Sequence, residues 1–160
     1  MDRYSCGLAI SSTEFVLLRD FNDCGIKTSL IKCNTENGIW TEMGNLQEDR
    51  SEYAAILFNG KIIVCGGDSF TRSTEIIPLN ILQKSPQFGM GTSEIISRKV
   101  GDINFPRRSP ALGILKIDGK SKVILFGGGE LVEEWDDEKE IWEISTNFIF
   151  KERFDFFAHC

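Results

Sequence analysis

The stretch KVILFGGGELVEEWDDEKEIW, from Lys122 to Trp142, decides the fold. Its apolar run ends at three consecutive glycines. Glycine adopts positive φ angles without a Cβ penalty, so an apolar run that ends in glycines is typical of a buried strand followed by a sharp turn. Trp135 and Trp142 then lie either side of six residues. The stretch therefore predicts one buried strand, a tight turn and two further strands.

The same pattern occurs earlier in the chain. The apolar run from Lys61 to Cys65 ends at a glycine pair, and Arg50 lies 16 positions before the first of these glycines. Another apolar run ends at Leu18, and the segment from Arg3 to Leu18 aligns with the segment from Arg50 to Cys65 without a gap. These alignments indicate a repeated structural unit.

Four arginines open the repeats, at spacings of 47, 58 and 45 residues: Arg3, Arg50, Arg108 and Arg153. They divide a single region, 1–160, into units of about 1–46, 47–104 and 105–151, with 152–160 beginning a further unit. Sequence repeats of 20 to 50 residues are typical of solenoids and propellers.

Units of about 50 residues, with a glycine pair after an apolar strand and a closing tryptophan, resemble the kelch repeat, whose units are four-stranded blades of a β-propeller. The residues that carry the resemblance are Gly66, Gly67, Gly127, Gly128, Trp40, Trp135 and Trp142. Unit one has Arg19-Asp20 in place of the glycine pair, and unit two has no tryptophan. The resemblance implies an all-β fold, an incomplete kelch-type β-propeller of about three four-stranded antiparallel blades plus one extra strand.

Within this frame the clearest hairpin joins residues 53–58 to 61–65 through Asn59-Gly60, the preferred pair for a type I′ turn. We expect Phe15, Ile63 and Ile124 on equivalent strands of successive sheets. Residues 80–98 are expected to form an extended loop whose role stays open, before an outer strand near 94–99. The last segment, 153–160, is expected to be the first strand of another blade.

Composition supports a folded chain, with 41% hydrophobic and 26% charged residues. Propellers typically close with about four to eight blades, and three units are fewer than that. An unclosed propeller exposes sheet faces and edges, which favours pairing with another chain. We therefore expect a fragment, a truncated gene product or one part of an assembly, with self-association through unclosed blade edges as one outcome.

Charge and patterning exclude several classes of function. The net charge of −6 argues against a nucleic-acid surface, which needs clustered Lys and Arg. No run approaches the ~18 apolar residues of a membrane span, and the first residues lack signal-peptide features. We expect no membrane role and a cytoplasmic location. The five cysteines form no C-x-x-C pair, so neither a disulfide framework nor a zinc site is predicted.

The sequence contains no recognisable catalytic constellation. Its single histidine, His159, is next to the C-terminus, and its tyrosines are Tyr4 and Tyr53. Propeller oxidases of the galactose oxidase type need a Tyr/His ligand set, which these residues cannot supply. The pair Asp136-Asp137 could bind Ca²⁺, but a solvated turn is the simpler interpretation. We predict no enzyme activity, no cofactor and no metal site.

The repeated arginines are the candidate binding residues. In kelch substrate adaptors, arginines just before the first strand of several blades line the propeller mouth and bind acidic peptides. The resemblance implies this role for Arg50, Arg108 and Arg153, and for Arg3. The guanidinium suits it because its fixed fork engages a carboxylate through two hydrogen bonds. Alternatively, each arginine caps a loop or pairs with a neighbour such as Glu48, Asp49 or Glu52, and the tryptophans are more simply core residues.

These observations predict a non-catalytic protein–protein interaction module, either a substrate-recognition or a scaffold fragment, with a protein partner of unknown identity. Two alternatives stay open. One is a fragment of a propeller enzyme of oxidase or sugar epimerase type; the other is a degenerate kelch gene product without a binding role. A companion BTB or F-box domain would distinguish a ligase receptor from a scaffold, but fold alone does not supply function.

Overall fold

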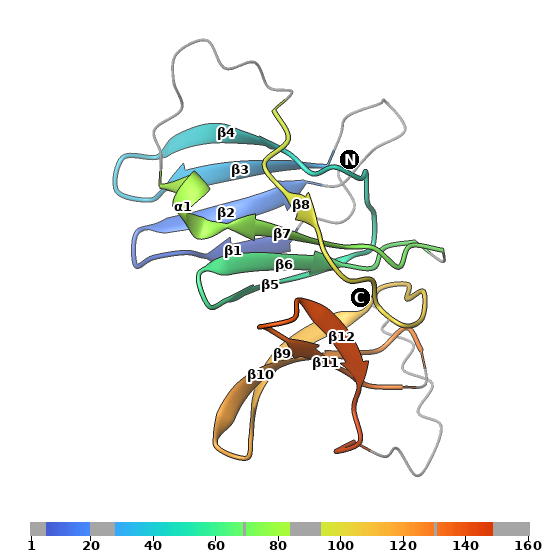
Figure 1. Ribbon diagram of the computed structural model, residues 1–160. Coiled ribbons are helices and arrows are strands. Elements are labelled where there is room, and N and C mark those ends of the chain that lie inside the picture. Colours follow the sequence, from blue (N-terminus) through green and yellow to red (C-terminus); the bar gives the residue numbers. More distant parts are fainter. Residues whose placement is uncertain (1–5, 20–27, 69, 84–93, 130, 149–160) are drawn as a thin grey trace.

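The computed structural model describes residues 6–19, 28–68, 70–83, 94–129 and 131–148. These residues form three four-stranded antiparallel sheets, and in each sheet the strands lie side by side in the order in which the chain makes them. Figure 1 shows the sheets following one another from the top of the molecule to the bottom without closing into a ring. The predicted fold, all-β and an incomplete propeller-like array, is confirmed.

We call the sheets blade one, blade two and blade three. Blade one consists of β1 (Cys6–Ala9), β2 (Glu14–Arg19), β3 (Ser29–Asn34) and β4 (Ile39–Asn45). Blade two consists of β5 (Ala54–Phe58), β6 (Lys61–Cys65), β7 (Thr74–Pro78) and β8 (Arg98–Lys99). Blade three consists of β9 (Ala111–Ile117), β10 (Lys120–Phe126), β11 (Glu133–Asp136) and β12 (Ile141–Ile144).

The second strands are equivalent in the three blades. Phe15, Ile63 and Ile124 lie on β2, β6 and β10, as the repeat predicted. The first strands are also neighbours, since β5 lies against both β1 and β9. The segment 153–160, expected to open a further blade, lies outside the described residues.

Blade two departs from expectation after its third strand. The chain forms a short helix, α1 (Leu79–Leu82), and the outer strand has only two residues instead of the predicted 94–99. Residues just before β8 pair with blade one instead: Asn45 donates its N–H to the Glu94 carbonyl at 2.8 Å, and Ile96 donates to the Asn45 carbonyl at 3.0 Å. The missing part of the outer strand is therefore used to join blades one and two.

The core lies between the blades. Side chains alternate across a strand, so Ile62 and Val64 on β6 face blade one, whereas Ile63 and Cys65 face blade three. All four are fully buried. Burial of each of the three aliphatic side chains, Ile62, Ile63 and Val64, contributes about 1.5–3 kcal/mol, so the blades depend on one another for stability. The partners of β6 in the two clusters are Val16, Leu18, Leu30, Val123, Leu125, Trp135 and Trp142.

The glycine pairs make the turns that the sequence predicted. Gly66 has a φ of 69° and Gly128 a φ of 63°, in the left-handed region. A Cβ on Gly128 would lie 2.4 Å from the Arg108 carbonyl oxygen. The turn after β10 therefore needs glycine both for its backbone conformation and for the close approach of the chain that leads into β9.

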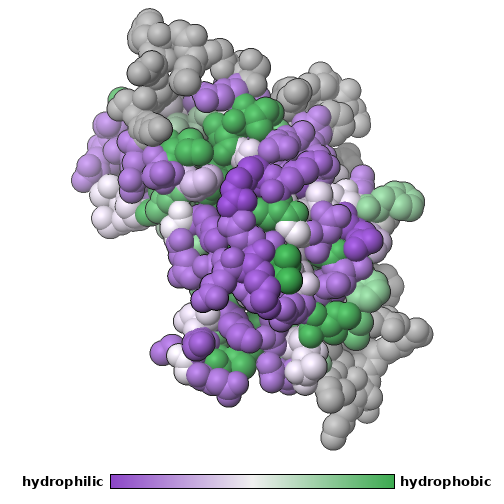
Figure 2. Space-filling model, viewed as in Figure 1, coloured by the Kyte–Doolittle hydropathy of each residue, from purple (hydrophilic) through white to green (hydrophobic). Residues whose placement is uncertain are grey.

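The molecular surface in Figure 2 is largely hydrophilic on the face in view, with smaller hydrophobic patches between the polar areas. In the part of the chain that the structure describes, no helix has the length and apolar character needed to cross a membrane.

Candidate functional site

A buried ion pair fixes the chain between blades one and two. Arg50, in the linker, donates from Nε and Nη2 to Oε1 of Glu75 on β7, at 3.2 and 2.8 Å. Its Nη1 donates to the carbonyls of Gly66 and Ser73, both at 2.9 Å. Both charged side chains are fully buried. Glu75 also accepts the backbone N–H of Gln47 at 2.8 Å, so the linker is tied to the blade that follows it.

Blade three repeats this arrangement with Arg107. Its Nε and Nη2 donate to Oε1 of Glu133 at 3.1 and 3.0 Å, and its Nη1 donates to the Gly127 carbonyl at 2.9 Å. Glu133 also accepts the backbone N–H of Asn104 at 2.7 Å. A buried charge is tolerated when it is paired and hydrogen bonded, and both pairs meet that condition. We call these two pairs the linker clamps.

The linker clamps change the alignment of the repeats. The counterpart of Arg50 in blade three is Arg107, whereas the sequence comparison used Arg108. The spacing to the paired carboxylate could not have identified it, because Glu75 follows Arg50 by 25 positions, whereas Glu133 follows Arg107 by 26 and Arg108 by 25. Sequence reasoning did not detect the two glutamates.

The predicted binding arginines therefore differ in location. Arg50 is fully buried, and its donors bind groups of the same chain, so we place it in the scaffold. Arg108 is exposed, and its Nη2 donates to Oε1 of Glu52 at 2.9 Å. The hydrogen bond from Arg108 is the main reason why the pKa of Glu52 is lowered. Arg3 and Arg153 lie outside the described residues.

The three predicted tryptophans also differ. Trp135 and Trp142 are buried with ring centroids 5.1 Å apart, as expected of core residues. The indole Nε1 of Trp142 donates to Oγ1 of Thr74 in blade two at 2.9 Å. Trp40 is 56% exposed, and its ring lies edge-on to Phe15 at 5.4 Å. Trp40 is therefore not a core residue of this structure.

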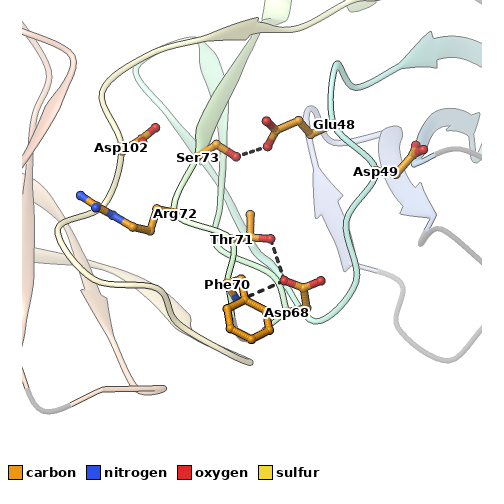
Figure 3. Close-up of a pocket in the computed structure, with 8 residues that line it drawn as sticks. All are labelled: Glu48, Asp49, Asp68, Phe70, Thr71, Arg72, Ser73 and Asp102. Atoms are coloured by element: carbon orange, nitrogen blue, oxygen red, sulfur yellow. Dashed lines mark hydrogen bonds between the residues drawn. The ribbon is translucent and has the colours of Figure 1, made fainter.

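The linkers and the β6–β7 loop form an open polar depression, which we call the rim (Figure 3). Its lining residues come from the linker before β5, the β6–β7 loop and the linker before β9: Glu48, Asp49, Asp68, Phe70, Thr71, Arg72, Ser73 and Asp102. Phe70 is 89% exposed.

Hydrogen bonds fix the rim on both sides of Phe70. Asp68 Oδ1 accepts the backbone N–H of Phe70 at 3.2 Å and the hydroxyl of Thr71 at 2.9 Å (Figure 3). Arg72 Nε donates to the Ile103 carbonyl at 3.0 Å, and the Ile103 N–H donates to the Arg72 carbonyl at 2.9 Å. The loop is therefore joined to the next linker, and Phe70 is held on an ordered support.

One rim carboxylate, Glu48, has a lowered pKa. Partial burial alone would raise the pKa of Glu48, but hydrogen bonds from Lys99 and Ser73, together with the charge of Arg50, outweigh burial and lower it. Asp49 Oδ1 accepts the backbone N–H of Thr28 at 3.2 Å. The rim thus combines exposed carboxylates with one exposed aromatic ring.

Among the described residues, no group of three or more His, Cys, Asp or Glu side chains is arranged to hold a metal ion. No protein-family model matches the sequence. A search of curated proteins likewise found no match.

Proposed function

We propose that the protein is a non-catalytic protein–protein interaction module of kelch type, and that the rim binds the partner. The observation that carries the proposal is Phe70, a large aromatic side chain that is 89% exposed on a hydrogen-bonded loop. Aromatic side chains are enriched among residues that contribute most to binding, and loops on a rigid scaffold commonly carry function. A substrate-recognition or scaffold role in the cytoplasm is the specific form of this proposal.

Two features support the assignment to the kelch type. The glycine pairs follow the second strand in blades two and three, at Gly66 and Gly127. Each blade is a meander of four antiparallel strands. Both features are those that the resemblance implies, and the linker clamps give the two blades the same internal support.

Arg108 is an exposed cation that this surface offers to a partner, in addition to Arg72 of the rim. It lies beside the rim, because the Arg107 carbonyl accepts the N–H of Gly67 at 3.3 Å, next to the β6–β7 loop. Its pairing with Glu52 is exposed on the arginine side, and exposed ion pairs contribute only about 0–1 kcal/mol. A partner carboxylate could therefore approach the exposed guanidinium and compete with Glu52 for it.

The test is affinity purification of the full chain with quantitative mass spectrometry. Phe70→Ser and Arg108→Glu change the rim. Ile39→Ser and Lys120→Glu are matched controls at the opposite ends of the blades, in the hairpins that join β3 to β4 and β9 to β10. We expect one or more proteins to be retained by the wild type and both controls and lost with the rim variants. Identical retention by all five chains, or retention of nothing by the wild type, would overturn the proposal.

A further inference from the structure

The sequence contains two Asn-Gly pairs, and each lies in a hairpin turn. Asn37-Gly38 lies between β3 and β4, and Asn59-Gly60 lies between β5 and β6. All four residues are exposed. Such a pair is chemically reactive, because glycine has no side chain to hinder its backbone nitrogen from attacking the amide carbon of the asparagine. The two pairs therefore have the same local chemistry, and the fold decides how each side-chain amide is held.

The side chain of Asn37 folds back over its own backbone. Its Oδ1 accepts the N–H of Ile39, two residues further on, at 3.0 Å. This is an Asx turn, which mimics a backbone turn and brings the side-chain carbon Cγ over the nitrogen of the intervening Gly38. The Ile39 N–H also donates to the oxygen on which negative charge develops when Cγ is attacked, as a donor of an oxyanion hole does. Position and polarisation both favour attack on Cγ.

The backbone of Gly38 is oriented for this reaction. Its φ of 69° lies in the left-handed region, which glycine adopts without strain. Its N–H donates to the Asn34 carbonyl at 2.9 Å, which fixes the plane of the peptide unit. That hydrogen bond lies in the peptide plane, whereas attack on Cγ occurs from the face of the plane. The hydrogen bond therefore leaves the approach to Cγ open.

Asn59 is held in a different way. Its Nδ2 donates to Oδ2 of Asp137 in blade three at 2.9 Å, so the amide is turned toward another blade and not toward its own backbone. The turn itself is fixed on both sides, because Phe58 pairs with Lys61 and the Gly60 carbonyl accepts the N–H of Leu79 at 2.8 Å. Attack by the Gly60 nitrogen requires the contact with Asp137 to break and the turn to open.

Asn34 completes the comparison. Its Oδ1 accepts the N–H of Glu36 at 2.9 Å, so it also forms an Asx turn. The next residue is Thr35, whose branched Cβ hinders approach to the backbone nitrogen. Asn34 thus has the Asx turn without the glycine, Asn59 has the glycine without the Asx turn, and Asn37 has both.

We propose that Asn37 is a site of spontaneous deamidation in the folded protein, and that the fold protects Asn59. The nitrogen of Gly38 forms a bond to Cγ of Asn37, the bond from Cγ to Nδ2 breaks, and ammonia leaves with the proton that the Gly38 nitrogen gives up. One water molecule then opens the cyclic imide at either carbonyl, which produces aspartate or isoaspartate without any oxidant or reductant.

The modification adds one negative charge to an exposed turn beside Ile39 and Trp40, which are 58% and 56% exposed. This turn lies at the end of the blades opposite to the rim. The proposal therefore stands or fails independently of the proposed partner surface.

The experiment follows the 160-residue chain during incubation in mildly alkaline buffer at physiological temperature, both folded and in urea. Peptide mass spectrometry with electron-transfer fragmentation measures deamidation at each asparagine and separates aspartate from isoaspartate. In the folded chain we expect Asn37 to deamidate about tenfold or more faster than Asn59 and Asn34. In urea, Asn59 should reach the rate of Asn37, because both are then unrestrained Asn-Gly pairs, whereas Asn34 should stay slow.

Isoelectric focusing of two matched variants checks the assignment. Asn37→Gln should abolish the acidic form that accumulates in the folded wild type, because the longer side chain closes a larger ring much more slowly. Asn59→Gln should leave that form unchanged. The proposal is overturned if folding slows deamidation at Asn37 as much as at Asn59, if Asn34 reacts as fast as Asn37, or if Asn37→Gln retains the acidic form.

Discussion

Replacing Glu75 by glutamine tests the linker clamps directly. The change keeps the shape of the side chain but removes the nearer and fully buried one of the two carboxylates that pair with Arg50, because Glu75 lies 2.8 Å from Nη2 and the partly exposed Glu48 lies 3.3 Å from it. Removing one partner of a buried ion pair costs about 3–5 kcal/mol, because the remaining charge is left uncompensated. We therefore expect Glu75→Gln to lower the free energy of unfolding by about 3–5 kcal/mol, a large part of the about 5–15 kcal/mol typical of a domain.

The assay is urea unfolding followed by tryptophan fluorescence, in which the loss appears as a lower midpoint at an unchanged slope. Glu133→Gln repeats the test in blade three and should behave alike, because its carboxylate binds Arg107 with the same geometry. The control is Glu52→Gln, whose partner Arg108 is exposed, and its expected cost is about 0–1 kcal/mol. Equal losses for Glu75→Gln and Glu52→Gln would refute the reasoning, since burial would then make no difference to the pair.

Three further predictions concern single positions. Gly128→Ala should lower the urea midpoint far more than Gly119→Ala, because a Cβ would meet the Arg108 carbonyl at 2.4 Å in the first case and nothing within 4 Å in the second; equal midpoints would contradict this. Burial raises the pKa of Cys65 to about 12. A thiol-alkylating reagent at neutral pH should therefore modify Cys65, as detected by mass spectrometry, only when urea unfolds the chain. Modification of Cys65 in the folded chain would contradict its buried position. Burial alone would raise the pKa of Glu134, but hydrogen bonds from Lys122, Ser145 and Asn147 lower it. Its contribution to stability is therefore present above the ordinary pKa of 4.5 and is lost as the pH falls below that value. In urea unfolding at a series of acidic pH values, Glu134→Gln should make the free energy of unfolding depend less on pH, and an unchanged dependence would show that other carboxylates cause it.

Local patterns predicted the strands because the signals lie within each strand and its turn. The strand β6 was predicted with its exact bounds, since a continuous apolar run lies between Asn59-Gly60 and Gly66-Gly67. Both central residues of its hairpin turn have positive φ angles, 46° at Asn59 and 73° at Gly60, as a type I′ turn requires. Such information needs no knowledge of the rest of the fold.

The alignment of the arginines failed for a geometric reason. Antiparallel hairpins with the same two-residue turn lengthen by pairs of residues, one on each strand. The strands of the blade-three hairpin have seven residues each, against five in blade two, so the distance from arginine to glycine grows by four, from 16 to 20. That distance leads to Arg107. The increase of three implied by Arg108 is odd and does not fit the register.

The outer strand of blade two and the exposure of Trp40 depend on neighbouring blades. Residues 94–96 pair with Asn45 of blade one, although they follow blade two in the chain. Trp40 and Trp142 stand in the same local pattern, and only the presence of blade two beside Trp142 makes their burial different. A single sequence carries no direct signal for contacts of this kind.

Blade one differs from the other blades in the polar parts of the repeat. At the place of Glu75 it has Ile31, and Ser29, the counterpart of Ser73, has a buried hydroxyl without a hydrogen-bond partner. In blade two, Ser73 Oγ accepts from Arg50 Nη2 at 2.7 Å. A buried unpaired hydroxyl costs about 1–3 kcal/mol, and the apolar contacts that Val16 and Leu18 make with blade two offset it. Blades two and three therefore carry the clamped linkers and the rim, whereas blade one meets blade two mainly through apolar surface.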